Sequence, residues 1–310
     1  MSEPLFRRVG IVGFGTIGQR WAAVFAHQGL AVGAYDPDPG RAAEFAALRP
    51  GLEADLAALL GPARPGGRVR VATDMGAALA GAQFVQECGP EQLEIKQALL
   101  AEIERHVEPS VTIASSSSAL SVSAMQALCR HPGRVVLGHP FNPAHLMPLV
   151  EIVGGEASED AHVRAARAFY EAIGKKPVTL NREITGHLAL RLMGALWREA
   201  IALVEEGVAS VEDVDRAFIY GPGPKWTLQG SFISNHLNAE GMESFLAKYG
   251  ATYEAIWADL KTASLSPATR AAVAAGTRAA IGERSDEALR SARDAGLVEI
   301  LKTVARKGAL

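Results

Sequence analysis

A glycine-rich turn, Gly13-Phe14-Gly15-Thr16-Ile17-Gly18, lies near the start of the chain and limits which folds the first half can adopt. A short apolar run at 9–12 precedes the turn, and residues 19–28 carry apolar side chains at helical spacing. A second apolar run, 31–35, ends at Asp36. Strand, glycine turn, helix, strand and acid in this order are typical of a dinucleotide-binding unit.

The turn and the acid each match one part of a dinucleotide. Gly13, Gly15 and Gly18 permit a tight turn that brings the backbone and the N-terminus of the helix close to a pyrophosphate. Asp36 lies 18 residues after Gly18, where a carboxylate accepts hydrogen bonds from a ribose diol and repels a 2′-phosphate. The sequence therefore predicts NAD rather than NADP. A purely structural βα turn leaves the position of Asp36 unexplained.

The rest of the first half alternates between strand and helix patterns. We expect helices at 41–60, 91–107 and 156–173 and strands at 68–73, 83–87, 111–114 and 176–180. Alternation of this kind indicates a doubly wound parallel sheet of the Rossmann type, which binds ligands beyond the carboxyl ends of its strands. Two polar segments, 88–91 and 115–118, follow such ends.

The second half lacks strand patterns. From residue 184 onward the pattern predicts helices at 187–206, 211–220, 239–260 and 267–305, with a rigid loop at 220–226. We therefore expect a Rossmann-type domain over 1–185 and an all-helical domain over 186–310. The apolar stripe of Leu188, Leu192, Ala195, Leu196 and Trp197 is consistent with intramolecular core or with an interface between domains or subunits.

Composition narrows the class of protein. A net charge of −3 and a pI near 6.3 give no indication of a nucleic-acid or membrane-surface partner. Only two cysteines occur, and the first residues lack the apolar core of a signal peptide, so we expect a cytoplasmic protein. No His/Asp/Glu cluster has metal-ligand spacing, so no metal is predicted.

A stretch from Ser115 to Glu151 contains a serine cluster, a histidine in GHPFNP and a glutamate closing LMPLVE. Hydroxyl, imidazole and carboxylate are the groups that remove a proton from an alcohol and stabilise the resulting charge. Each has an ordinary alternative: serines cap helices, here one beginning near Ser121, and a lone histidine is more often structural.

Four segments of the sequence carry a resemblance to a known family. QECGPEQLEIK (86–96), ASSSSAL (114–120), GHPFNP (138–143) and LMPLVEIV (146–153) resemble the 3-hydroxyacyl-CoA dehydrogenase superfamily, and within it the lambda-crystallin / L-gulonate 3-dehydrogenase branch. The family separates its serine, histidine and glutamate by 21 and then 12 residues. Ser118, His139 and Glu151 have the same two separations.

The resemblance implies a role for each position. His139 is the expected general base for the 3-hydroxyl of the substrate, Glu151 orients and stabilises its imidazole, and Ser118 hydrogen-bonds the reacting oxygen. Helical domains of this family pair into homodimers. The residues implied to contact NAD, beside the glycines and Asp36, are Thr16, Ile17, Glu91, Lys96 and Ser116.

One position departs from the family pattern G-F-x-x-N-R-L, whose Asn helps to hold the substrate. The equivalent stretch runs from Gly186 to Leu192 and has Leu190 in place of the Asn. An apolar side chain cannot make that hydrogen bond, so either His187 or Asn142 replaces it or the substrate differs.

Three substrate classes remain open. The segment between Asp36 and Val69 contains no lysine, which argues against the phosphates of a CoA thioester. A small sugar acid such as L-gulonate ranks first, with Lys225 expected to hold its carboxylate by charge. L-Carnitine is the alternative, because Trp226 is suited to a trimethylammonium group. A remote alternative is a non-catalytic, crystallin-like NAD-binding protein.

Overall fold

The computed structural model describes residues 6–307. The chain folds into two compact units, Met1–Ala189 and Leu190–Leu310. The boundary predicted near residue 185 lies in the segment that joins the last strand of the first unit to the first long helix of the second.

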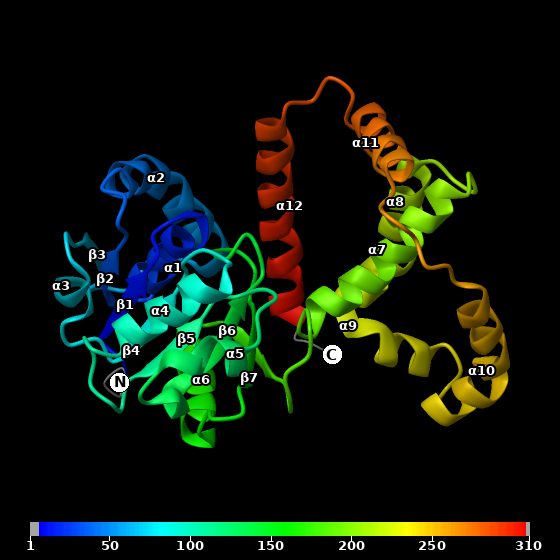
Figure 1. Ribbon diagram of the computed structural model, residues 1–310. Coiled ribbons are helices and arrows are strands. Elements are labelled where there is room, and N and C mark those ends of the chain that lie inside the picture. Colours follow the sequence, from blue (N-terminus) through cyan, green and yellow to red (C-terminus); the bar gives the residue numbers. More distant parts are fainter. Residues whose placement is uncertain (1–5, 308–310) are drawn as a thin grey trace. The chain divides into compact units, whose positions relative to one another are not determined.

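Unit 1 is built on one eight-stranded sheet, with strand order β3-β2-β1-β4-β5-β6-β7-β8 (Figure 1). All neighbouring strands run parallel except β6 and β7, so the predicted doubly wound parallel sheet is confirmed. The strands are β1 (Arg8–Val12), β2 (Ala31–Tyr35), β3 (Arg68–Val71), β4 (Phe84–Glu87), β5 (Thr112–Ser115), β6 (Val135–Pro140), β7 (Leu149–Gly154) and β8 (Lys176–Thr179).

The antiparallel pair β6–β7 was not predicted. Its connection, residues 141–148, is too short for the crossover of a dozen or more residues that a parallel pair requires. The short loop therefore turns the chain straight back, and the two strands form a hairpin within an otherwise parallel sheet. The register of this hairpin places His139 directly opposite Glu151.

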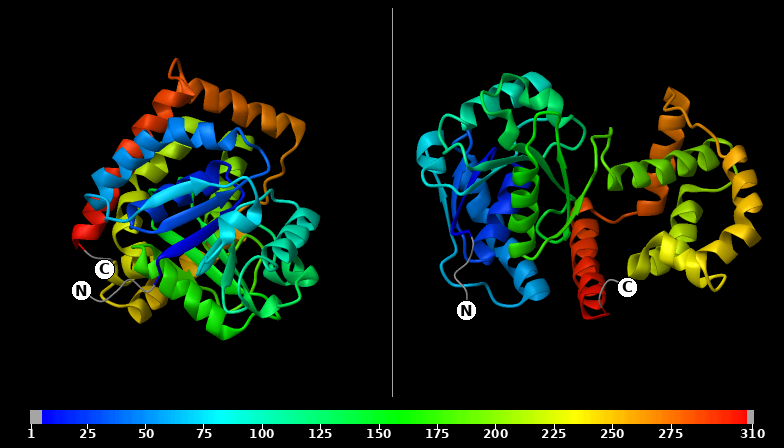
Figure 2. Two further views of the ribbon diagram at one scale, coloured as in Figure 1. Left: turned by 90° about the vertical axis from the view of Figure 1, so that its left-hand side faces the viewer. Right: turned by 90° about the horizontal axis from the view of Figure 1, so that it is seen from below.

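Helices cover both faces of the sheet, and each face has its own apolar cluster (Figure 2). On one face, side chains such as Trp21, Phe45 and Phe169 pack together, and on the other Leu79, Leu100 and Met125 do so. The first face carries α1 (Thr16–His27), α2 (Arg41–Leu60) and α6 (Asp160–Ala172), and the second carries α3 (Met75–Leu79), α4 (Leu93–Ile103) and α5 (Val122–Met125).

Unit 2 is helical, as predicted, but two of its expected boundaries were wrong. The predicted loop at 220–226 is a helix from Pro222 onward, because proline suits the first position of a helix. The predicted helix 267–305 is broken where Gly282 adopts a φ of 63°. The helices are α7 (Ala189–Glu205), α8 (Val211–Tyr220), α9 (Pro222–Leu237), α10 (Met242–Asp259), α11 (Pro267–Ile281) and α12 (Asp286–Lys307).

The apolar stripe at the start of α7 is exposed. Leu192 and Trp197 retain 67% and 57% of their accessible surface, and Leu188 and Leu196 are also exposed. The stripe belongs to neither buried apolar cluster of unit 1, and both alternatives, intramolecular core and interface, stay predictions. None of the helices in the described part of the chain is long and apolar enough to cross a membrane.

Candidate active site

The glycine turn between β1 and α1 leaves an open approach to the helix N-terminus. Gly13 has a φ of +90°, and a Cβ there would meet the Cys88 carbonyl at 2.5 Å, so only glycine fits. A Cβ at Gly15 would meet nothing within 4 Å. Gly15 is the N-cap of α1, with no side-chain cap and no acidic residue in the first turn, which begins at Thr16 and Ile17. These amides suit a pyrophosphate.

Asp36 lies beside this turn, directly after β2. Its Oδ2 accepts a hydrogen bond from the Phe14 amide at 2.6 Å, and its Oδ1 accepts one from the Asp38 amide at 3.0 Å. The carboxylate is thereby held next to the turn, and carboxylate oxygens have further lone pairs for a ribose diol. The residues present fit NAD, which when bound accepts a hydride from a substrate carbon.

The predicted base and its carboxylate form a close pair. His139 Nδ1 lies 2.8 Å from Glu151 Oε2, and Glu151 is completely buried. The amides of Leu188 and Ala189 donate to its other oxygen, both at 2.8 Å. Burial raises the pKa of Glu151, but the hydrogen bonds from His139 and the two amides together lower it below its usual value.

This pairing assigns the two nitrogens of the imidazole. An ionised carboxylate only accepts hydrogen bonds, so Nδ1 of His139 carries the hydrogen in the neutral ring. The lone pair of Nε2 is then available to take a proton. The dyad is therefore arranged as a general base with an orienting anion.

The serine turn after β5 is held by Glu91. Its Oε1 accepts from the Ser117 hydroxyl at 2.7 Å and from the amides of Ser118 and Ala119, each at 2.9 Å. The Ser118 hydroxyl itself is 3.4 Å away. Burial raises the pKa of Glu91, but the hydrogen bonds from Ser117 and Ala119 and the charge of Lys96 lower it overall. Glu91 therefore fixes the backbone that carries Ser118.

A buried ion pair lies beneath this turn. Lys96 Nζ donates to both oxygens of Glu87, at 2.9 and 3.0 Å, and to the Gly89 carbonyl at 3.0 Å. Glu87 also accepts from the Ser115 hydroxyl at 2.6 Å. Glu87 was missed in the sequence, although a charged last residue in a buried strand signals a paired group. Contact of Lys96 with a cofactor stays a prediction, since its ammonium points to Glu87.

Ser116 is joined to the end of β4 by its side chain. Gln86 Nε2 donates to its hydroxyl at 2.8 Å, and Cys88 Sγ lies 3.2 Å from the same oxygen. Burial raises the pKa of Cys88 to about 12, so its sulfur is a thiol rather than a nucleophilic thiolate. The contact of Ser116 with NAD likewise stays a prediction.

His187 connects the serine turn with the dyad. Its Nε2 lies 3.3 Å from the Ser117 carbonyl, and its ring centroid is 5.2 Å from that of His139. Burial lowers the pKa of His187, and the neighbouring His139 lowers it further. The sequence indicated His187 only as one possible replacement for the missing Asn. The feature that could have pointed to its place beside the dyad is that it is a histidine where the family pattern has Phe.

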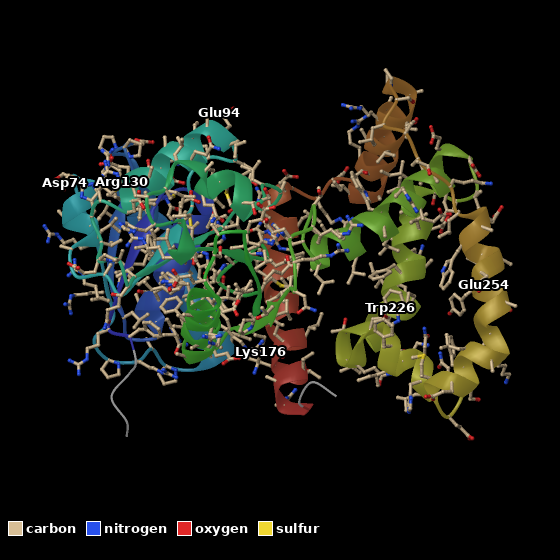
Figure 3. The ribbon with its side chains drawn as sticks, turned by 60° about the horizontal axis from the view of Figure 1, so that its bottom comes forward. Asp74, Glu94, Arg130, Lys176, Trp226 and Glu254 are labelled. Atoms are coloured by element: carbon tan, nitrogen blue, oxygen red, sulfur yellow. The ribbon has the colours of Figure 1, made fainter. Side chains whose placement is uncertain are left out.

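The predicted substrate residues fall in both units. Asn142 is exposed in the loop 141–148 of unit 1. Lys225 and Trp226 lie in α9 of unit 2, where the Trp226 ring is 6.2 Å from Phe218 (Figure 3). Leu190 lines an apolar hollow of about 790 Å³ within unit 2. The roles of Asn142, Lys225 and Trp226 stay predictions.

Together these features define a class of protein. A dinucleotide turn, a carboxylate-paired imidazole on β6 and a serine hydroxyl that follows the neighbouring strand β5 are the parts of an NAD-dependent dehydrogenase acting on an alcohol. Residues 8–184 match the NAD binding domain of 3-hydroxyacyl-CoA dehydrogenase, and residues 186–256 match its C-terminal domain. The chain belongs to the 3-hydroxyacyl-CoA dehydrogenase family, and it is an NAD-dependent 3-hydroxy acid dehydrogenase.

Individual relatives match over nearly the whole chain. An L-carnitine dehydrogenase of Nocardiopsis dassonvillei is 40% identical, and the match covers 96% of this chain and 92% of the relative. One of Streptomyces coelicolor is 39% identical, covering 99% and 98%. Among solved structures, 5-formyl-3-hydroxy-2-methylpyridine 4-carboxylic acid 5-dehydrogenase, an NAD+-dependent dismutase, is similar with a TM-score of 0.85 and 30% identity, covering 99% and 100%.

Proposed function

We propose that the protein oxidises the 3-hydroxyl of L-carnitine to the ketone, with NAD as hydride acceptor. The observation that carries the proposal is the set of relatives named L-carnitine dehydrogenase, which in the two examples above are 39–40% identical over at least 96% of the chain. The C3–H bond breaks with both electrons leaving as hydride, the O–H proton goes to the protein, and the C=O bond forms.

The residues of unit 1 supply the proton chemistry. Nε2 of His139 takes the hydroxyl proton, and Glu151, 2.8 Å from Nδ1, stabilises the imidazolium that results. The Ser118 hydroxyl donates to the substrate oxygen, because its own interaction with Glu91 is long at 3.4 Å and leaves the proton available.

The charges on α2 argue against a CoA ester. Its two arginines are already paired: Arg41 with Glu44 at 2.7 Å and Arg49 with Glu53 at 2.6 Å. This helix contains no lysine. The face that would meet CoA phosphates therefore offers few unpaired cations, whereas a small zwitterion needs only one cation and one aromatic or anionic contact.

We assign those contacts to Lys225 for the carboxylate and Trp226 for the trimethylammonium group. Lys225 has no carboxylate within ion-pair distance among residues 6–307, and Trp226 is 41% exposed. The sequence ranked a sugar acid above carnitine. That ranking finds no support among the relatives above, so L-gulonate becomes the comparison substrate.

Initial rates of NADH formation test the substrate. We expect kcat/KM for L-carnitine to exceed that for L-gulonate and 3-hydroxybutyrate by about 100-fold or more, the discrimination that a site built around charged groups can reach. Preference for 3-hydroxybutyryl-CoA or for L-gulonate would contradict the proposed substrate. D-Carnitine is the matched control, because it carries the same charged groups but cannot present its C3 hydroxyl and C3 hydrogen in the same geometry.

We also propose a homodimer formed through unit 2. Its helices expose many large apolar side chains, among them Leu192 at 67%, Trp197 at 57% and Phe232 at 81%. Apolar surface on this scale indicates an interface. Light scattering coupled to size exclusion is expected to give twice the 32.7 kDa chain mass, and Phe232→Glu is expected to weaken the association. A wild-type monomer would contradict the dimer.

A further inference from the structure

The loop 141–148 joins the strand of the base to the strand of its carboxylate. It leaves β6 two residues after His139, returns into β7 two residues before Glu151, and presents the exposed side chain of Asn142 near its start. Its backbone makes short turn bonds, from the Leu146 and Met147 amides to the Pro143 carbonyl, each 3.0 Å, and its last residue is held by the Lys176 amide, which donates to the Pro148 carbonyl at 2.8 Å. These bonds leave the carbonyls of Ala144 and Met147 to be paired by another group.

The side chain of Lys175 holds the second half of this loop. Its Nζ donates to the Ala144 carbonyl at 2.6 Å and to the Met147 carbonyl at 2.8 Å. Lys175 directly precedes β8 and retains only 6% of its accessible surface. Ala144 is completely buried, so its carbonyl has no water to bond if the amine is removed.

The same amine reaches the helix that follows the glycine turn. Lys175 Nζ lies 5.2 Å from the centroid of the buried Trp21 ring on α1. No carboxylate within the described residues is within ion-pair distance of this amine. Burying an amine without an anionic partner costs free energy. The carbonyls of Ala144 and Met147 and the ring of Trp21 offset that cost only while the amine stays in this position.

A second tether limits what Lys175 can affect. His145 Nε2 lies 3.0 Å from Asp55 on α2, which fixes the middle of the loop. The dyad itself is held independently, by the β6–β7 register and by the amides of Leu188 and Ala189 on Glu151. Release of Lys175 therefore shifts the loop and its exposed Asn142 more than it shifts His139.

We propose that Lys175 is a positioning residue, which sets the conformation of the loop 141–148 and through it the contact of Asn142 with the substrate. The proposal rests on the proposed function for the identity of the substrate, but not for the tether itself. Its signature is a rise in KM for the substrate with kcat nearly retained, because the base keeps its geometry.

The experiment compares Lys175→Met with Lys176→Met. Lys176 is the next residue, its side chain is exposed, and it is labelled in Figure 3. Amide hydrogen exchange is measured over 141–148, together with kcat and KM for L-carnitine and the affinity for NADH. We expect faster exchange in 141–148, with β5 unchanged, and a KM raised about tenfold in Lys175→Met alone.

Two further variants keep the test decisive. Lys175→Gln keeps N–H donors and is expected to show smaller effects should Lys175→Met fail to fold. Asn142→Ala is expected to raise KM by itself and to combine less than additively with the Lys175 variant, as residues acting through one contact do.

Unchanged exchange in 141–148 would overturn the tether, whatever the substrate. Faster exchange with unchanged KM, or with a loss confined to kcat, would overturn the link to Asn142. If the wild type oxidises none of the tested substrates, the proposed function fails, and hydrogen exchange still decides the role of Lys175.

Discussion

Replacing Glu151 by Gln separates the charge of the dyad from its shape. The carboxylate accepts three hydrogen bonds, from His139 Nδ1 and from the amides of Leu188 and Ala189, all at 2.8 Å. A glutamine side chain of the same size has one oxygen and one NH2 group. Whichever way it turns, its NH2 group meets a donor, either the imidazole or the pair of amides.

The magnitude follows from these contacts. If the amide oxygen stays with Leu188 and Ala189, the NH2 group faces His139 and favours the tautomer with its hydrogen on Nε2, which cannot take a proton. The imidazolium also loses its buried counter-charge. Loss of a general base of this kind lowers kcat by about 10²- to 10⁴-fold. Stability falls by roughly 1–3 kcal/mol, because one buried donor remains unpaired.

The assay is steady-state oxidation of the substrate by Glu151→Gln and by the wild type, with urea unfolding on both. NADH affinity is the control, since the glycine turn and Asp36 do not contact Glu151. A variant that folds, binds NADH normally and retains more than a tenth of wild-type kcat would show that the charge of Glu151 is not needed by His139.

Three other changes test separate parts of the structure. Asp36→Ala is expected to raise the KM for NAD about tenfold and to lower the ratio of kcat/KM for NAD to kcat/KM for NADP. An unchanged ratio would contradict the assignment of Asp36 to the ribose diol. Lys96→Met leaves the carboxylate of Glu87 buried without its counter-charge, and is expected to lower the urea-unfolding free energy by about 3–5 kcal/mol; a loss below 1 kcal/mol would argue against the ion pair. Burial lowers the pKa of Lys175 to about 7, so between pH 7 and 10 the unfolded chain binds more protons than the folded chain. The free energy of unfolding is therefore expected to rise with pH, by at most about 1.4 kcal/mol per pH unit relative to Lys175→Met. An equal pH dependence in the wild type and Lys175→Met would mean that the two carbonyls and Trp21 fully offset the burial of the amine.

Local patterns predicted the fold where short-range rules determine it. The helix 41–60 and the strand 31–35 have the predicted bounds, because both end at turn residues that break the pattern. The two strands of the β6–β7 hairpin were not predicted, and their antiparallel direction follows from the short loop 141–148 that joins them. The α9 helix escaped because Gly221-Pro222-Gly223-Pro224 has the composition of a turn, whereas Pro222 begins a helix.

The candidate site shows the same division. His139, Glu151 and Ser118 could be chosen because spacing and resemblance identify polar groups near strand ends. The pairing of Glu87 with Lys96 could not be predicted from the sequence, because burial between β4 and α4 determines which groups meet. Pairing of buried groups is a property of three-dimensional packing, which periodicity along the chain does not report.

In the proposed reaction, His139 removes the hydroxyl proton of L-carnitine as the hydride leaves C3. The most direct measurement is the rate of NADH formation from L-carnitine at saturating NAD by the wild type and by His139→Ala. The dyad geometry predicts a loss of about 10²-fold or more in kcat, with NADH binding unchanged. A wild type that oxidises L-carnitine and a His139→Ala variant whose kcat lies within threefold of it would contradict the role of His139 as the base.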